Sequence, residues 1–174
     1  YTLEAGRADT RTERKLYDAK RLGVNRVSIN TQTTNDAILA ALGRRHTKDD
    51  FIRAFHMARG TGFDVINTDI IAGLPGETAD SFKRTVHDVL SLSPENITVH
   101  TLSVKRASSL NYERTDITRE FDAVNDMLDF SASALSDFGY APYYIYRQKS
   151  TLGNLENVGY AKPGSECLYN VYMM

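Results

Sequence analysis

The sequence has a single cysteine, almost no net charge and no long hydrophobic run, and each of these excludes a class of protein. Cys167 is the only cysteine among 174 residues, so no disulfide can form within the chain, and a reducing, cytoplasmic location is expected. The formal net charge of -1 provides no basic surface for nucleic acid. No apolar run has the length that a membrane span needs. A globular protein without nucleic-acid or membrane partners is therefore expected.

Hydrophobic residues make up 41% of the chain and charged residues 25%. These fractions are typical of a globular protein, and the length suffices for one ordinary domain with a buried core. Tyr1 to Ala5 show a strand pattern already under way, with no initiator methionine. We therefore expect the sequence to be a piece of a longer chain.

Strand and helix patterns alternate along the sequence at intervals of roughly 30 residues. The expected strands cover residues 1–5, 24–30, 63–72, 97–102 and 140–146. The expected helices lie between them, with capping residues at Thr10, Asn35, Thr47 and Thr78 and a last long helix over 118–138. Such alternation is typical of an α/β protein with a parallel sheet, either an open doubly wound sheet or part of a barrel.

Two finer expectations follow from the same patterns. The apolar run from Ile70 to Ala72 indicates a strand that is covered on both faces. Residues 147–174 are less periodic and contain Gly153, Gly159 and Gly164. We expect this tail to form a loop-and-strand extension over one end of the sheet.

Polar residues mark the ends of the first four expected strands. Glu4 ends the first, Gln32 follows the second, Asp69 lies in the third, and His100 begins a polar run to Arg106. In both kinds of parallel sheet, ligands bind at the carboxyl ends of the strands. Each residue alone could instead cap a helix or pair with a neighbour. The ordered set favours a ligand site.

Five segments, in order, carry a family resemblance: LEAGR, RVSINTQT, ALGRRHT, NTDIIAGLPGET and YYIYRQKSTLGNLENVGYAKPG. Together they resemble the oxygen-independent coproporphyrinogen III oxidases, which are radical S-adenosylmethionine (SAM) enzymes. The last segment is most similar to their HemZ-like coproporphyrinogen dehydrogenase subgroup. The resemblance implies a partial parallel (β/α) barrel, with residues 1–139 supplying strands three to six of six and residues 140–174 forming a C-terminal extension.

The resemblance also implies an activity, the oxidative decarboxylation of coproporphyrinogen III propionates to vinyl groups in haem biosynthesis. Its cofactors would be SAM and a [4Fe–4S] cluster, with a protein reductant as partner. The C-x-x-x-C-x-x-C segment that holds the cluster in such enzymes is missing from the sequence, so this chain alone is expected to be inactive. A barrel without its first two strands would expose a sheet edge, through which self-association is expected.

Two alternatives stay open at this point. The first is a haem-binding and trafficking chaperone related to the same family. The second is a generic α/β nucleotide-binding domain without radical chemistry. That second alternative predicts a G-x-G-x-x-G motif after the first strand, whereas the residues from Glu4 to Arg7 contain one glycine.

The resemblance assigns SAM contacts to specific residues of this sequence. Glu4 matches a carboxylate that contacts SAM, Gln32 an amide near the ribose, and Arg44 an arginine that faces the methionyl carboxylate. Asp69 matches a carboxylate that binds ribose hydroxyls, and Ser103 falls at a backbone contact on the adenine side. Alternatively, Arg44 is a solvated cation at a helix end, and Asp69 is an N-cap or part of an internal pair.

The residues expected to contact the substrate are chosen by their charge. Coproporphyrinogen carries four carboxylates, so cations are expected around it, and the candidates are Lys105, Arg106, Arg147, Lys149 and Lys162. The tyrosines of 140–146 could form a wall against a macrocycle, although strand aromatics more often belong to a core. His100 is expected to be a core histidine and Cys167 a bystander. The four histidines have no metal-ligand spacing.

Overall fold

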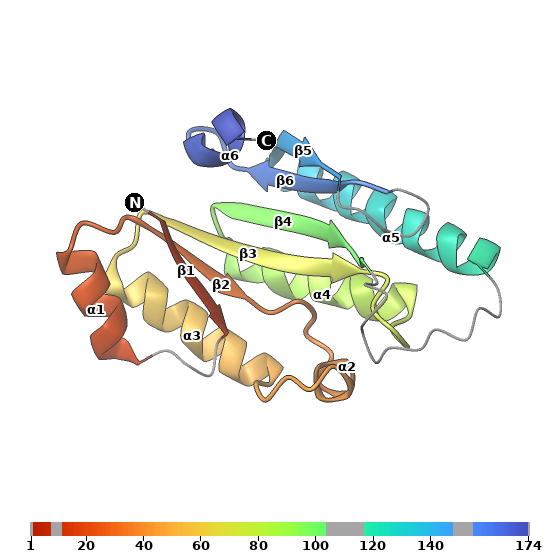
Figure 1. The fold of residues 1–174 in the computed structure, drawn as a ribbon, viewed down its shortest axis with the longest axis horizontal. Helices are drawn as coiled ribbons and strands as arrows, with labels where there is room; N and C mark the ends of the chain where they lie inside the picture. The colour runs from red at the N-terminus through yellow and green to blue at the C-terminus, as the bar shows by residue number, and fades with distance from the viewer. Residues whose placement is uncertain (1, 8–11, 104–116, 148–154, 174) are drawn as a thin grey trace.

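The computed structural model describes residues 2–7, 12–103, 117–147 and 155–173, which form one six-stranded sheet with helices packed against it (Figure 1). The strands are β1 (Thr2–Arg7), β2 (Arg26–Asn30), β3 (Val65–Ala72), β4 (Asn96–Thr101), β5 (Ala141–Tyr146) and β6 (Asn157–Ala161). The helices are α1 (Glu13–Arg21), α2 (Asp36–Ala41), α3 (Lys48–Thr61), α4 (Ala79–Leu92), α5 (Ile117–Asp137) and α6 (Leu168–Met173).

The order of the sheet is β1-β2-β3-β4-β6-β5. The first four strands are parallel, as expected for the α/β class and for strands of a partial barrel. β6 pairs antiparallel with β4, and β5 pairs antiparallel with β6. The tail therefore extends the edge of the sheet instead of covering its end, which corrects the expectation for residues 147–174. The expected boundary between residues 139 and 140 falls between α5 and β5, inside this arrangement.

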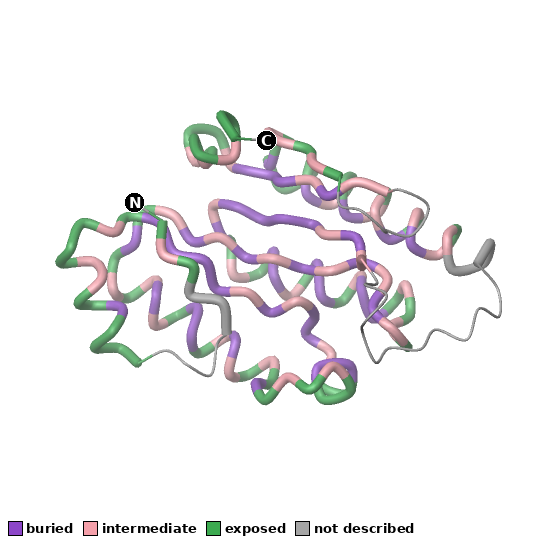
Figure 2. Tube along the Cα trace, viewed as in Figure 1, coloured by how far each residue is buried: buried purple, intermediate pink, exposed green. Residues whose placement is uncertain are grey.

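The hydrophobic core lies between the sheet and the helices. Val27, Ile66 and Ile97 point to the helical side and are at most 1% exposed, and they pack with Phe51 of α3 and Phe82 of α4. Burying each such side chain contributes about 1.5–3 kcal/mol. Figure 2 shows the buried residues concentrated along the strands and the inward sides of the helices.

The opposite face of the sheet is only partly covered. Along β3, buried and half-buried residues alternate strictly, because successive side chains of a strand point to opposite faces. The expected two-sided burial of the run from Ile70 to Ala72 is therefore wrong. Ile70 and Ala72 are buried, whereas Ile71 is half-buried. The face that this leaves accessible carries most of the polar strand residues.

Side-chain caps begin most of the helices where the sequence predicts them. Asn35, Thr47 and Thr78 accept hydrogen bonds from backbone N–H groups of α2, α3 and α4, respectively. The prediction for the first helix is wrong by two residues, because α1 is capped by the hydroxyl of Thr12, which accepts from the Lys15 N–H. The predicted cap, Thr10, lies outside the described residues.

Besides the pairing of β6 with β4, side-chain contacts attach the C-terminal segment to the sheet. The buried Arg26 guanidinium donates to the Ser165 carbonyl over 2.7 Å and to Oδ1 of Asn96. A Cβ atom at Gly159 of β6 would lie 1.8 Å from the ring of Tyr144, so this ring packs directly on the glycine backbone. These contacts fix the positions of β5 and of the segment leading into α6 next to β4.

Candidate functional site

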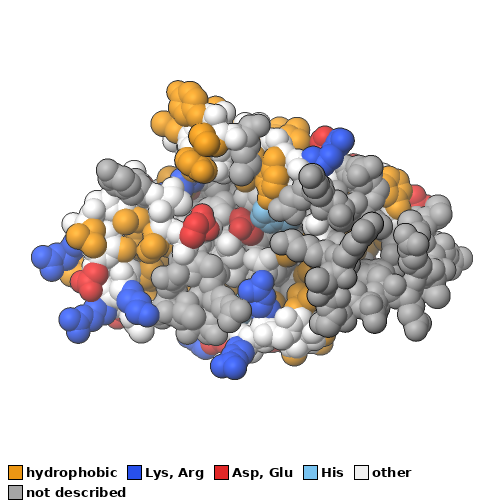
Figure 3. Space-filling view, viewed as in Figure 1, with side chains coloured by type: hydrophobic (Ala, Val, Ile, Leu, Met, Phe, Trp, Pro, Cys, Tyr) orange, Lys and Arg blue, Asp and Glu red, His pale blue; other side chains and the backbone are white. Residues whose placement is uncertain are grey.

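A cavity of about 370 Å³ lies on the face of the sheet opposite the core. Its wall combines residues of β1 to β5 with the segment around α6, namely Thr2, Glu4, Arg26, Asn67, Asp69, Thr98, His100, Tyr143, Tyr144, Cys167, Tyr169 and Asn170. In the space-filling view, acidic side chains lie beside a histidine near the middle of this face (Figure 3). The candidate site is this cavity.

The polar side chains reach the cavity because they alternate with core residues along each strand. On β3, Asn67 and Asp69 line the cavity, and on β4, Thr98 and His100 do so. Parallel pairing aligns them, since Asp69 lies beside Thr98 in the register. The site therefore occupies the inner surface of the sheet along the strands, rather than only the rim at their carboxyl ends.

Asp69 is held by amide groups from two strands. Nδ2 of Asn67 donates to Oδ1 of Asp69 over 2.8 Å, and Nδ2 of Asn30 donates to Oδ2 over 2.7 Å. Oδ1 of Asn30 accepts from the Asp69 N–H over 3.2 Å. Because a carboxylate has about four lone-pair sites, Asp69 can still accept hydrogen bonds from a ligand in the cavity.

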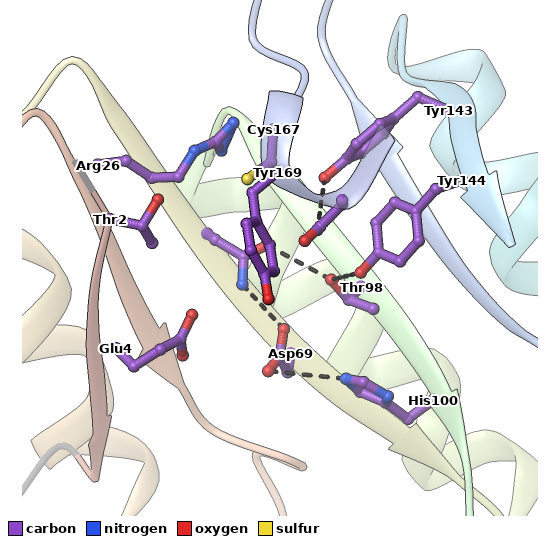
Figure 4. A pocket seen from close by; sticks show the side chains of 12 residues that line it. Thr2, Glu4, Arg26, Asp69, Thr98, His100, Tyr143, Tyr144, Cys167 and Tyr169 are labelled. Atoms are coloured by element: carbon purple, nitrogen blue, oxygen red, sulfur yellow. Dashed lines mark hydrogen bonds and ion pairs between the residues drawn. The ribbon is translucent and has the colours of Figure 1, made fainter. Parts of the chain in front are cut away.

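Glu4 points into the same cavity from β1, opposite Asp69 (Figure 4). Partial burial raises the pKa of the Glu4 carboxyl, and the negative charge of Asp69 raises it further. A hydrogen bond from Ser28 and the charge of Arg26 act in the opposite direction. Two carboxyl groups facing one cavity suit a ligand that brings positive charge or several hydroxyl donors.

Tyr143 and Tyr144 of β5 form another part of the cavity wall. The rings of Tyr144 and Tyr146 stack with centroids 6.0 Å apart and an interplanar angle of 8°. The hydroxyl of Tyr144 lies 3.3 Å from Oγ1 of Thr98, and burial raises the pKa of Tyr144. Tyr143 accepts a hydrogen bond from Nδ2 of Asn170 over 3.3 Å. The cavity thus has an acidic side and an aromatic side.

Of the five residues expected to contact SAM, the structure brings Glu4 and Asp69 into one cavity. Gln32 lies beside Asp69 through its backbone, because its N–H donates to the Asp69 carbonyl over 3.0 Å and its φ is +71°. Arg44 follows α2 and is half-buried, and Ser103 is half-buried at the end of β4. These three residues do not line the cavity, so their contacts with SAM stay predictions.

The loops that follow β2 and β3 are joined by hydroxyl groups. Thr33 donates to Oε1 of Glu77 over 2.6 Å, and Ser81 donates to the same oxygen over 3.1 Å. Burial raises the pKa of Glu77, while these two hydrogen bonds lower it. Gly73 adopts φ +81°, a backbone conformation that glycine adopts without strain. This network holds the GLPGET turn against the loop that contains Gln32.

The two cations expected on the substrate side that the structure describes, Arg147 and Lys162, do not line the cavity. Arg147 donates to Oε1 of Glu156 over 2.7 Å at an exposed position. Lys162 bonds Oγ of Ser93 over 2.7 Å. Neither lines the cavity, and Lys105, Arg106 and Lys149 lie outside the described residues. The described cation in the wall is Arg26, which sequence reasoning missed.

His100 and Cys167 differ from what their sequence context suggests. His100 was expected in the core, yet it lines the cavity and contacts Asp69 and Tyr146. Cys167 also lines the cavity as a free thiol. Period-two alternation along β4 would have placed His100 on the face of Thr98, whereas the position of Cys167 depends on a long-range contact.

Two further features, a ligand set for a metal cluster and a membrane-spanning helix, are absent from the described residues. Among them, no group of three His, Cys, Asp or Glu side chains could hold a metal ion. The part of the chain that the structure describes therefore does not fit a [4Fe–4S] cluster. No helix in those same ranges is long and apolar enough to cross a membrane.

Comparison with known proteins agrees with this geometry. The model of the radical SAM superfamily matches residues 4–89, from β1 to α4, and the chain belongs to this superfamily. It is 43% identical, over 99% of its own length, to the oxygen-independent coproporphyrinogen-III oxidase-like protein HemZ of Bacillus subtilis (strain 168). It is 28% identical, over 98% of its length, to the heme chaperone HemW of Escherichia coli (strain K12). The chain spans 35% and 41% of these relatives, respectively.

A solved structure shows the same fold. The coproporphyrinogen III oxidase HemN from Escherichia coli, a radical SAM enzyme, superposes with a TM-score of 0.70 at 21% identity. The match covers 95% of this chain and 36% of HemN. The α/β fold of the radical SAM type that is expected from the sequence is therefore confirmed.

Proposed function

We propose that this chain provides the SAM-binding part of the barrel in a radical SAM oxidoreductase that acts on coproporphyrinogen III in haem biosynthesis. The observation that carries the proposal is that Glu4 and Asp69 face one cavity across the parallel strands. The similarity to HemZ, an oxidase-like protein, supports the substrate class.

The chemistry of the cavity fits SAM. A sulfonium, an ammonium and two ribose hydroxyls are groups that carboxylates attract or accept hydrogen bonds from. Tyr143 and Tyr144 add aromatic surface to the wall, which suits a cation or a planar base. The volume of about 370 Å³ falls within the range of small-molecule pockets. When bound, SAM supplies the radical chemistry that gives the superfamily its name, while Glu4 and Asp69 would orient it.

The substrate is proposed to bind beside this cavity rather than inside it. A porphyrinogen with four carboxylates would be repelled by Glu4 and Asp69. Cations outside the cavity, with Lys105, Arg106, Arg147 and Lys149 as candidates, would be needed for it. We further propose that the [4Fe–4S] cluster is held outside the described residues. A protein reductant, self-association through the edge strands β1 or β5 and a cytoplasmic location stay predictions.

A haem chaperone is the second candidate function. It is supported by the heme chaperone HemW of Escherichia coli, to which the chain is similar over nearly its whole length. Both functions use the same fold, so the cavity alone does not distinguish them. They differ in whether porphyrinogen propionates become vinyl groups or haem is bound unchanged.

The test uses the full-length protein that carries this chain, with its cluster reconstituted. We expect SAM to bind, Glu4→Gln and Asp69→Asn each to weaken binding about tenfold, and Glu13→Gln on the exposed side of α1 to have no effect. Mass spectrometry would detect vinyl products from coproporphyrinogen III. Haem binding without vinyl formation would favour the chaperone, and failure of the wild type to bind SAM would overturn the proposal.

A further inference from the structure

His100 uses both ring nitrogens at the wall of the cavity. Its Nδ1 lies 2.9 Å from the hydroxyl of Tyr146 on β5, and its Nε2 lies 3.6 Å from Oδ2 of Asp69 on β3. The side chain is 22% exposed, and Figure 4 shows the ring directed at Asp69. His100 therefore stands between a tyrosine and the carboxylate proposed to bind SAM.

The two contacts favour one tautomer of a neutral ring. If Nε2 carried a lone pair, it would face the carboxylate of Asp69, and the two would repel each other. If Nε2 carries the proton, it points a donor at Oδ2, and Nδ1 is free to accept from the Tyr146 hydroxyl. The hydrogen bond at one imidazole nitrogen commonly fixes the other in this way. Tyr146 thus orients a donor toward Asp69.

A second series of contacts reaches the other oxygen of the same carboxylate. The Tyr144 hydroxyl lies 3.3 Å from Thr98, which donates to Oδ1 of Asn67 over 3.5 Å, and Asn67 donates to Oδ1 of Asp69. The tyrosines that start the two series are two residues apart on β5 and stack on each other. The antiparallel part of the sheet is therefore connected to both oxygens of Asp69.

We propose that His100, oriented by Tyr146, is a positioning residue that keeps the Asp69 carboxylate in the rotamer that accepts the hydroxyl donors of SAM. The proposal rests on the proposed function and adds a determinant of SAM affinity that does not itself belong to the ligand-binding carboxylates. The charged and titratable groups around His100 are Asp69, Glu4 across the cavity, Tyr146, and Tyr144 stacked on Tyr146.

The experiment measures SAM affinity of the full-length protein by calorimetry. His100→Phe keeps the ring that packs at 6.1 Å from the ring of Tyr146 but removes both nitrogens, and we expect affinity to fall about tenfold. His100→Gln places an amide donor where Nε2 lies, and we expect affinity within about twofold of wild type. Tyr146→Phe removes the hydroxyl that bonds Nδ1 of His100, so either nitrogen of the ring can carry the proton. We expect this variant to bind SAM about threefold more weakly. His56→Phe, at an exposed position of α3, is the matched control.

A double-mutant cycle separates positioning from a general structural role. If His100 acts through Asp69, His100→Phe adds no loss in a protein that already carries Asp69→Asn. Additive losses would overturn the inference, as would wild-type affinity in both His100→Phe and Tyr146→Phe. If His100→Phe fails to fold, His100→Gln and Tyr146→Phe still decide the outcome. A wild type that does not bind SAM would refute the proposed function, whereas loss in Asp69→Asn without loss in the His100 variants refutes the inference alone.

Discussion

At the scale of single residues, the chemistry of Asp69 depends on one neighbour on its own strand and one on β2. Amide donors from Asn30 and Asn67 hold its two oxygens. For Glu4, across the cavity on the edge strand β1, partial burial and the charge of Asp69 together raise the pKa. One carboxyl group is thus held in place, and the other is made easier to protonate.

Glu4→Gln should stabilise the protein at neutral pH. An acid whose pKa is raised by folding gives stability that is present at low pH and lost as the pH rises through the raised pKa. The amide side chain of the variant does not ionise and so avoids this loss of stability. The free energy of unfolding of the variant should therefore exceed that of the wild type at pH 7. This difference in the free energy of unfolding should vanish below pH 4.5, the ordinary pKa of a glutamate carboxyl. Urea unfolding at both pH values checks this, and a lower stability at pH 7 would contradict it. The same variant should bind SAM less tightly, as expected where stability and function oppose each other.

Gly159→Ala should displace the aromatic wall of the cavity. The added Cβ would lie 1.8 Å from the Tyr144 ring, so the ring must move or the strand must shift, at a cost of about 1–3 kcal/mol. Chemical denaturation measures the loss. Gly60→Ala is the control, because a Cβ there meets nothing within 4 Å and a helical Gly→Ala change gains up to about 1 kcal/mol. Equal stability of the two variants would refute the packing argument.

At the scale of elements, the sequence predicts the caps of α2, α3 and α4 but not the strand β6. The caps Asn35, Thr47 and Thr78 depend on residues three positions away, so the sequence shows them. The sequence pattern does not show β6 within the tail, because Gly159 interrupts it. A glycine is needed there because the Tyr144 ring of β5 packs against its backbone. For the first helix, Thr10 and Thr12 are both plausible caps by sequence, and the structure has Thr12 as the cap.

Thr47→Ala tests the best-formed cap. The Thr47 hydroxyl accepts from the Asp50 N–H, and the Asp50 carboxylate accepts from the Thr47 N–H. Removing the hydroxyl should lower the free energy of unfolding by about 1 kcal/mol. Thr47→Ser keeps the hydroxyl and should remain close to wild type. SAM affinity should be unchanged in both variants, since α3 packs on the opposite face of the sheet from the cavity. A loss of affinity with either variant would show that the two faces are coupled.

At the scale of the whole molecule, the site combines the parallel strands β1 to β4 with the C-terminal segment that contains β5 and α6. Glu4 and Asp69 could be selected from the sequence because they lie on the parallel strands at positions that match the family motifs. Cys167, Tyr169 and Asn170 could not, because they reach the cavity only through the turn near Ser165. That turn is held by Arg26, a residue of β2 that is 139 positions away in the sequence. Sequence patterns of short range contain no record of such a contact.

Arg26→Met tests whether this contact completes the cavity. The variant keeps an apolar stem of similar length but leaves the Ser165 carbonyl and the buried Asn96 amide oxygen without their donor. We expect a loss of about 1–3 kcal/mol. Because the loss is local, hydrogen exchange should accelerate in peptides covering 164–173, whereas peptides of α3 should keep their protection. Arg53→Met, which removes an exposed pair with Asp50, should change stability by less than about 1 kcal/mol. If Arg26→Met left exchange at 164–173 unchanged, the segment would be held by the contact of α6 with β5 instead, and the wall of the cavity would not depend on Arg26.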